Sequence, residues 1–99
     1  MTIEKMKEGG QLTLALEGRL DTTTAPQLEG ELSGALDGVT ELALDFEKLE
    51  YLSSAGLRVL LAAQKVMNRQ GKMTLHHVNE TIREVFEVTG FIDILTIEA

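Results

Sequence analysis

Two adjacent serines, Ser53 and Ser54, are the residues whose type and position could best support chemistry in this sequence. They stand where a loop turns into a long apolar helix that we expect from about Ser54 to Gln70. A serine at a helix start ordinarily caps the helix, because its hydroxyl accepts a hydrogen bond from a free N–H group of the first turn. One serine is enough for capping, so the second indicates another role, either modification or contact with a partner.

Gly56, in the first turn of this expected helix, points the same way. A glycine inside a helix costs about 0.5–1 kcal/mol relative to alanine, which makes sense if some group must approach the backbone there. A phosphoryl group at a helix start would meet free N–H groups and the positive end of the helix dipole. The spacing therefore favours a modified or partner-binding serine, with plain helix capping as the alternative.

Other residues that could do chemistry are more weakly supported. The two histidines, His76 and His77, are neighbours in an expected strand, so they point to opposite faces and cannot easily share one metal ion. Carboxylates at the carboxyl ends of parallel strands can form a site, but we interpret the ones here as solvated loop charges: Asp21, Asp45, Glu47 and Glu50. The sequence has neither a nucleophile elbow nor a phosphate-binding glycine loop. We therefore expect no catalytic residue, no metal and no cofactor.

Composition limits the class of protein further. The 99 residues suit a single domain over 1–99, and 16 acidic against 9 basic residues give a net charge of −7. Such a chain is poorly suited to bind nucleic acid or an anionic membrane surface. It has no cysteine and no apolar run that approaches the roughly 20 residues of a membrane span. We expect a cytoplasmic domain that binds no nucleic acid and does not insert into a membrane.

The pattern of apolar residues alternates between strand and helix periods. Strands are predicted over 1–7, 11–20, 41–46 and 72–78, with a last short strand or frayed helix over 92–98, and a loop is expected over 47–52. Three helices are predicted. The first runs from Thr24 to Gly38 and begins with a capping box of Thr24 and Gln27, the second covers 54–70, and the third follows a cap at Asn79. The order predicts an α/β fold, a mixed sheet of four to five strands with three to four helices packed mainly on one face.

The faces of the 54–70 helix separate into groups at 100° per residue. The arc expected to meet the sheet comprises Val59, Leu60, Ala63, Val66 and Met67. A basic stripe on one flank comprises Arg58, Lys65 and Arg69. Leu57 and Leu61 fall outside both groups, so they are either covered by the following helix or form an exposed apolar pair beside the serines, usable for docking.

Over essentially its whole length the chain resembles a STAS domain of the bacterial anti-sigma factor antagonist type. The resemblance rests on Gly18-Arg19-Leu20-Asp21, on Leu44-Asp45-Phe46 and, most specifically, on Tyr51-Leu52-Ser53-Ser54-Ala55-Gly56-Leu57. In that family the motif is Asp-Ser-Ser/Thr-Gly, and its first serine is phosphorylated by a partner kinase that is also the anti-sigma factor. By position, Ser54 is the phosphoacceptor, while Ser53 replaces the aspartate and becomes a rival acceptor. Ala55 replaces the second hydroxyl residue, and Asp21 matches the family's acidic residue near the acceptor.

The resemblance implies a phosphorylation-gated binding module and not an enzyme. Unphosphorylated at Ser54, it would bind an anti-sigma factor that is also a serine kinase and supplies the ATP site, and so free a sigma factor for transcription. A phosphatase is a further candidate partner. Phosphate would add about −1.5 to −2 charges beside Asp21 and Glu50 and weaken the complex. The expected partner-binding residues are Asp21, Ser53, Ser54, Ala55, Gly56, Leu57, Arg58 and Leu61.

Two other classes stay open. One is a STAS-domain subunit of a transporter or signalling complex that has no phosphoswitch. The other is a small enzyme acting on an anionic metabolite, which is disfavoured because the sequence shows no pairing of a nucleophile with a base.

Overall fold

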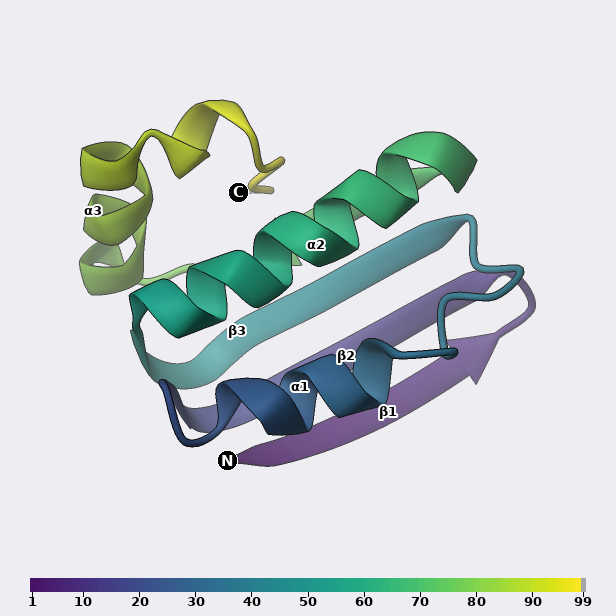
Figure 1. Cartoon of the computed structure of the whole chain (residues 1–99), viewed down its shortest axis with the longest axis horizontal. Helices are drawn as coiled ribbons and strands as arrows, with labels where there is room; N and C mark the ends of the chain where they lie inside the picture. Colours follow the sequence, from purple (N-terminus) through teal and green to yellow (C-terminus); the bar gives the residue numbers. More distant parts are fainter. Residues whose placement is uncertain (99) are drawn as a thin grey trace.

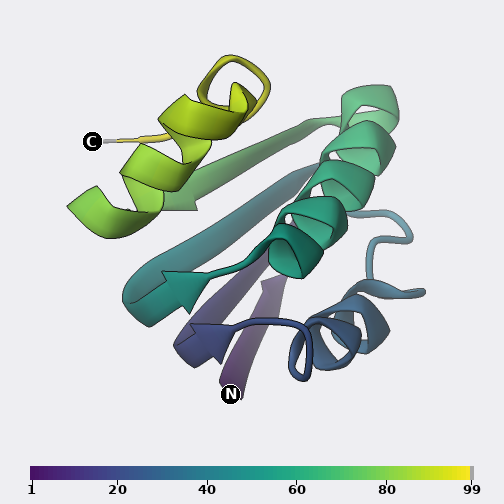
Figure 2. The same cartoon turned by 60° about the vertical axis from the view of Figure 1, so that its left-hand side comes forward.

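A computed structural model describes residues 1–98, which form a four-stranded mixed sheet in the order β1-β2-β3-β4. Its strands are β1 (Thr2–Glu8), β2 (Gln11–Leu20), β3 (Glu41–Leu52) and β4 (Lys72–His76). β1 is antiparallel to β2, while β2, β3 and β4 run parallel. The helices α1 (Ala25–Leu32), α2 (Ser54–Gln70) and α3 (Glu80–Thr89) lie on one face of this sheet (Figures 1 and 2). The predicted α/β architecture is therefore confirmed.

The hydrophobic core lies between the sheet and the helices. Alternate residues of a strand point to one face, so β2 and β3 each bury a row of side chains: Leu12, Leu14, Leu16, Leu20, Leu42, Leu44, Phe46, Leu49 and Leu52. The opposite face of the sheet presents half-buried Thr13, Ala15, Ala43 and Thr74. None of the helices formed by residues 1–98 is long and apolar enough to cross a membrane.

β3 is longer than the sequence pattern indicates. The segment 47–52 was expected to be a loop, but it continues the strand to Leu52 beside the second half of β2. The pairing register shifts twice along this stretch, and the buried residues Leu49 and Leu52 lie three apart instead of two. A strand with such irregularities loses the period of two that identifies it in a sequence.

The first helix differs from its prediction at both ends. Thr24 precedes α1 but makes no side-chain cap hydrogen bond, because its hydroxyl donates to the Arg19 carbonyl oxygen (2.7 Å) and accepts from the Asp21 N–H (2.8 Å). The predicted capping box is therefore wrong, and the Gln27 amide donates to the Met1 carbonyl oxygen instead (2.9 Å). α1 ends at Leu32, before the expected Gly38, because the backbone turns extended at Ser33.

The C-terminal part follows its prediction more closely. The Asn79 side chain caps α3 by accepting a hydrogen bond from the Ile82 N–H (2.8 Å), and Gly90 ends that helix with the positive φ that glycine tolerates (83°). A 3-10 turn (Phe91–Asp93) follows. The last short strand is reduced to one isolated parallel bridge between Leu75 and Ile97.

Candidate functional site

The candidate site forms where β2 and β3 end side by side. The two strands pair in parallel up to Leu20 and Leu52, and the Ser53 N–H donates to the Leu20 carbonyl oxygen (2.9 Å). The turn that begins at Asp21 therefore lies next to the start of α2. This edge of the sheet is where side chains from distant parts of a parallel fold come together.

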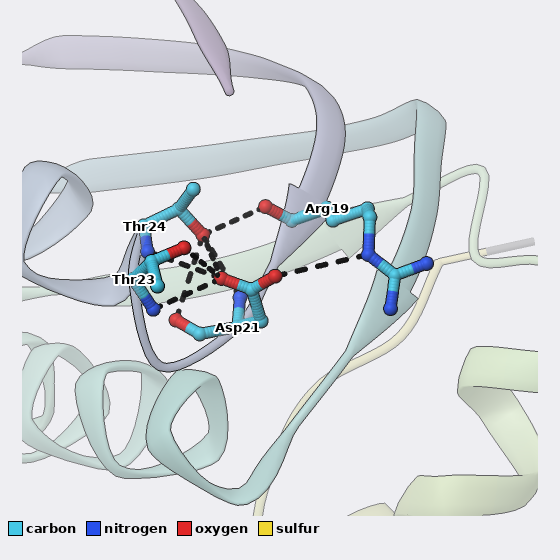
Figure 3. A network of polar contacts seen from close by, with 4 residues as sticks. All are labelled: Arg19, Asp21, Thr23 and Thr24. Atoms are coloured by element: carbon cyan, nitrogen blue, oxygen red, sulfur yellow. Dashed lines mark hydrogen bonds and ion pairs between the residues drawn. The ribbon is translucent and has the colours of Figure 1, made fainter.

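Asp21 is held by a network of hydrogen bonds (Figure 3). Its carboxylate Oδ1 accepts from the Thr23 N–H (3.0 Å), the Thr23 hydroxyl (2.8 Å) and the Thr24 N–H (3.2 Å). These hydrogen bonds, above all that of the Thr23 hydroxyl, hold the pKa of Asp21 below its usual value against the opposing effect of partial desolvation. Asp21 is therefore held as a negative charge in the turn directly after Leu20, whose carbonyl oxygen binds the Ser53 N–H.

Arg19 extends the same network. Its guanidinium Nε lies 3.7 Å from Asp21 Oδ2 (Figure 3), and its Cζ lies 4.5 Å from the centre of the Tyr51 ring on the neighbouring strand. A guanidinium over an aromatic face is attracted by the ring's negative π-surface. No local pattern in the sequence indicates that Thr23 and Arg19 contact Asp21. The pairing of Arg19 with Tyr51 appears only once the strand register is known.

The two serines differ in accessibility. Ser53 is the residue before α2 and has an extended backbone, yet its side chain makes no capping hydrogen bond, and its Oγ is buried without a partner. Ser54, the first residue of α2, is exposed. Capping by Ser53 therefore does not explain the serine pair. A modifying enzyme can reach the hydroxyl of Ser54 more readily than that of Ser53.

Gly56 is explained by packing. A Cβ atom at this position would lie 2.7 Å from Leu20 Cγ and 3.0 Å from Leu52 Cδ1, so only glycine lets α2 approach the ends of β2 and β3 this closely. Gly56 is itself buried. The glycine is therefore explained by close packing of α2 on the sheet, and not by the approach of an external group to the backbone, as the sequence suggested.

The remaining residues of the expected surface have mixed accessibility. Leu57 is 5% exposed and belongs to the core, so it is not part of an exposed apolar pair. Leu61 is half-buried. Ala55 is half-buried against the core, and Arg58 is exposed. The prediction that Val66 meets the sheet is wrong: it is 40% exposed and borders a hollow next to Leu32 and Ser33 at the end of α1.

A second cluster of polar side chains joins β3 to the loop after β4. His77 Nδ1 lies 2.9 Å from Asp45 Oδ1, and the potential ligand atoms of these two residues and Glu47 all lie within 4.8 Å of one another. His76 instead contacts the Thr74 hydroxyl (2.9 Å), so the two histidines do have separate surroundings. Both sides of the His77–Asp45 pair are partly exposed, as expected for a surface ion pair.

This pair makes stability depend on pH. The Asp45 hydrogen bond and charge raise the pKa of His77, so the stabilisation is complete below the unfolded histidine value of about 6.5 and is lost as pH rises through the higher folded value. Burial raises the pKa of Asp45, but hydrogen bonds from His77 and the Glu47 N–H outweigh it and lower the pKa overall. The contribution of Asp45 is therefore lost as pH falls through its folded value.

We expect the free energy of unfolding of the wild type to decrease as the pH rises from about 6 to about 8. The decrease should be smaller in His77→Gln and in Asp45→Asn, because each variant lacks one member of the pair. Urea denaturation at the two pH values measures this difference. An identical pH dependence in all three proteins would contradict the coupling of His77 to Asp45.

Comparison with known proteins identifies the class that this fold and site define. A family model described as "Mlab, STAS domain" matches residues 3–96, so the chain belongs to the STAS domain family. The chain is 39% identical in sequence to BtrV of Bordetella bronchiseptica, a protein assigned as an anti-sigma factor antagonist. The alignment covers 98% of this chain and 84% of BtrV. The anti-sigma-B factor antagonist of Staphylococcus aureus is 28% identical to this chain, and the alignment covers 96% of this chain and 90% of the Staphylococcus protein. Within the STAS domains the chain therefore belongs to the anti-sigma factor antagonist family, whose members are regulatory proteins and not enzymes.

Solved structures show the same fold. An anti-sigma factor antagonist from Mycobacterium paratuberculosis superposes with a TM-score of 0.86 at 23% identity, covering 97% of this chain and 83% of its own. The Bacillus cell fate determinant SpoIIAA in its phosphorylated form superposes with a TM-score of 0.76 at 22% identity, covering 99% and 92%. At such identities the likeness extends to the fold alone.

Proposed function

We propose that this chain binds an anti-sigma factor when Ser54 is unphosphorylated, so that a sigma factor is released to direct transcription. The observation that carries the proposal is the contrast between the two serines: Ser54 is an exposed residue at the start of α2, whereas the hydroxyl of Ser53 is buried. The names of the relatives, which are anti-sigma factor antagonists, support the choice of partner.

Phosphorylation of Ser54 would switch the complex off by charge. A phosphate adds about −1.5 to −2 charges at neutral pH. It would sit beside Asp21, whose carboxylate is fixed by hydrogen bonds, on a chain that already has a net charge of −7. Partner groups that accept this surface when Ser54 is neutral would then face repulsion and an added desolvation cost.

The partners follow from this scheme. The anti-sigma factor is itself the serine kinase and supplies the ATP site, so the chain needs no cofactor of its own. A phosphatase returns Ser54 to the binding-competent form. All of these proteins act in the cytoplasm, where the sigma factor meets RNA polymerase.

Site mapping tests the proposal. After incubation with the anti-sigma kinase of the same organism and ATP, mass spectrometry is expected to place one phosphate on Ser54. Ser54→Ala should remain unlabelled, and the matched control Ser53→Ala should be labelled like the wild type, because its acceptor is intact. Phosphate on Ser53, with Ser54→Ala labelled normally, would show that the acceptor is the buried serine.

The same experiment separates the second candidate function. A chain that stays unlabelled and purifies in a stable complex with a membrane transporter would be a STAS-domain subunit without a phosphoswitch. The replacement of the family's aspartate by Ser53 is the feature that favours this alternative.

A further inference from the structure

The outer face of α2 is positively charged although the chain as a whole is acidic. The helix contains Arg58, Lys65 and Arg69 and no carboxylate, against a net charge of −7 for the chain. All three cations are exposed, and none of them takes part in an ion pair within residues 1–98. Their charges are therefore available to any anionic group that comes close to this helix.

Arg58 is placed to reach a group on Ser54. The two residues are four apart in α2, so their side chains lie on the same face of the helix, about 40° apart around its axis. An anionic residue that precedes a cationic one by four positions is the favourable orientation for such a pair. The planar guanidinium of arginine also matches a phosphate group in a bidentate arrangement.

The other charged groups nearby cannot replace Arg58 in this role. Arg19 is already engaged by Asp21 and the Tyr51 ring. Lys65 lies eleven residues from Ser54, about 16 Å along the helix axis. Glu29 of α1 borders the same hollow as Arg58 but forms no ion pair with it among residues 1–98.

We propose that Arg58 pairs with the phosphate on Ser54, so that the modification also removes a free cation from the surface of α2. This inference rests on the proposed phosphorylation of Ser54. The phosphate then lies along the helix, held by Arg58 and by the positive end of the helix dipole, instead of projecting into solvent. Phosphorylation thus changes the surface twice, by adding negative charge beside Asp21 and by neutralising the first member of the basic stripe.

The test installs phosphoserine at position 54 through an expanded genetic code, so that no kinase is needed. The ³¹P NMR signal of the phosphate is then titrated in the otherwise unchanged chain, in Arg58→Gln, in Arg58→Lys and in Lys65→Gln. The second pKa of a free phosphoserine is about 6, and a neighbouring cation lowers it. We expect Arg58→Gln to raise the phosphate pKa by about 0.5 or more, a roughly threefold change in proton affinity.

The controls decide between pairing and a general charge effect. Lys65→Gln removes the same charge from the same helix and should leave the titration unchanged, while Arg58→Lys should restore part of the shift. Superimposable curves for the unchanged chain and a folded Arg58→Gln would overturn the proposal, as would equal shifts in Arg58→Gln and Lys65→Gln.

The outcome is independent of the proposed function. If the anti-sigma kinase does not label Ser54 but the titration depends on Arg58, the proposed function fails and the pairing stands. If the kinase labels Ser54 and Arg58→Gln changes nothing in the titration, the pairing fails and the proposed function stands.

Discussion

Leu57→Ala is expected to lower the free energy of unfolding by about 2–5 kcal/mol, the range for deleting a buried leucine side chain. Leu57 is 5% exposed within the core formed by the sheet and the helices. Urea denaturation with linear extrapolation measures the loss. The affinity of the folded fraction for the anti-sigma factor should change little, because a buried side chain does not touch the partner.

Leu61→Ala is the matched control for this substitution. It deletes the same atoms one turn later in α2, at a half-buried position. It should cost clearly less stability than Leu57→Ala, and if Leu61 anchors the partner it should weaken binding by about 1.5–3 kcal/mol, the value of burying a leucine. Equal stability losses in the two variants would contradict the placement of Leu57 in the core.

Ser54→Asp is expected to weaken binding of the anti-sigma factor by about 1–3 kcal/mol, roughly 5- to 150-fold in affinity. The substitution adds a permanent negative charge at the exposed start of α2, though less charge than a phosphate carries. Isothermal titration calorimetry of the purified proteins measures the difference.

Ser54→Ala serves as the neutral counterpart. Its affinity should stay close to that of the wild type, and its stability should change by no more than about 0.5 kcal/mol, because Ser54 is an exposed surface residue. Equal affinities of Ser54→Asp and Ser54→Ala would mean that this surface does not gate binding.

The regular elements could be predicted from the sequence because their periods are undisturbed. β2 and α2 have the bounds that the pattern indicates, since β2 alternates strictly up to Leu16 and Gly71 interrupts α2. The second half of β3 was missed because shifts in register spoil the alternation. α1 was predicted too long because Leu36 continues the helical spacing, although a turn beyond the helix buries it.

The site could be predicted only in part. The sequence identifies Ser53, Ser54 and Asp21 as candidates, but which serine is accessible depends on how α2 meets the sheet. The reason for Gly56 lies in its contact with Leu20, 36 residues away in the chain. The pairing of Asp45 with His77 likewise joins β3 to the loop after β4, 32 residues away in the chain. Contacts of this kind depend on strand register, which no local pattern encodes.

The parallel pairing of β2 with β3 also ties the site to the folding reaction. The partners in this ladder, such as Gln11 and Glu41, are 30 residues apart, so their contacts form only after a long loop has closed. The hydrogen bond from Ser53 to Leu20 depends on that pairing, and it brings the turn after β2 next to the start of α2. In a chain still emerging from the ribosome the two halves of the site are far apart. Under the phosphorylation proposed for Ser54, a kinase that recognises the completed edge of the sheet would act only on molecules in which β2 and β3 have already paired.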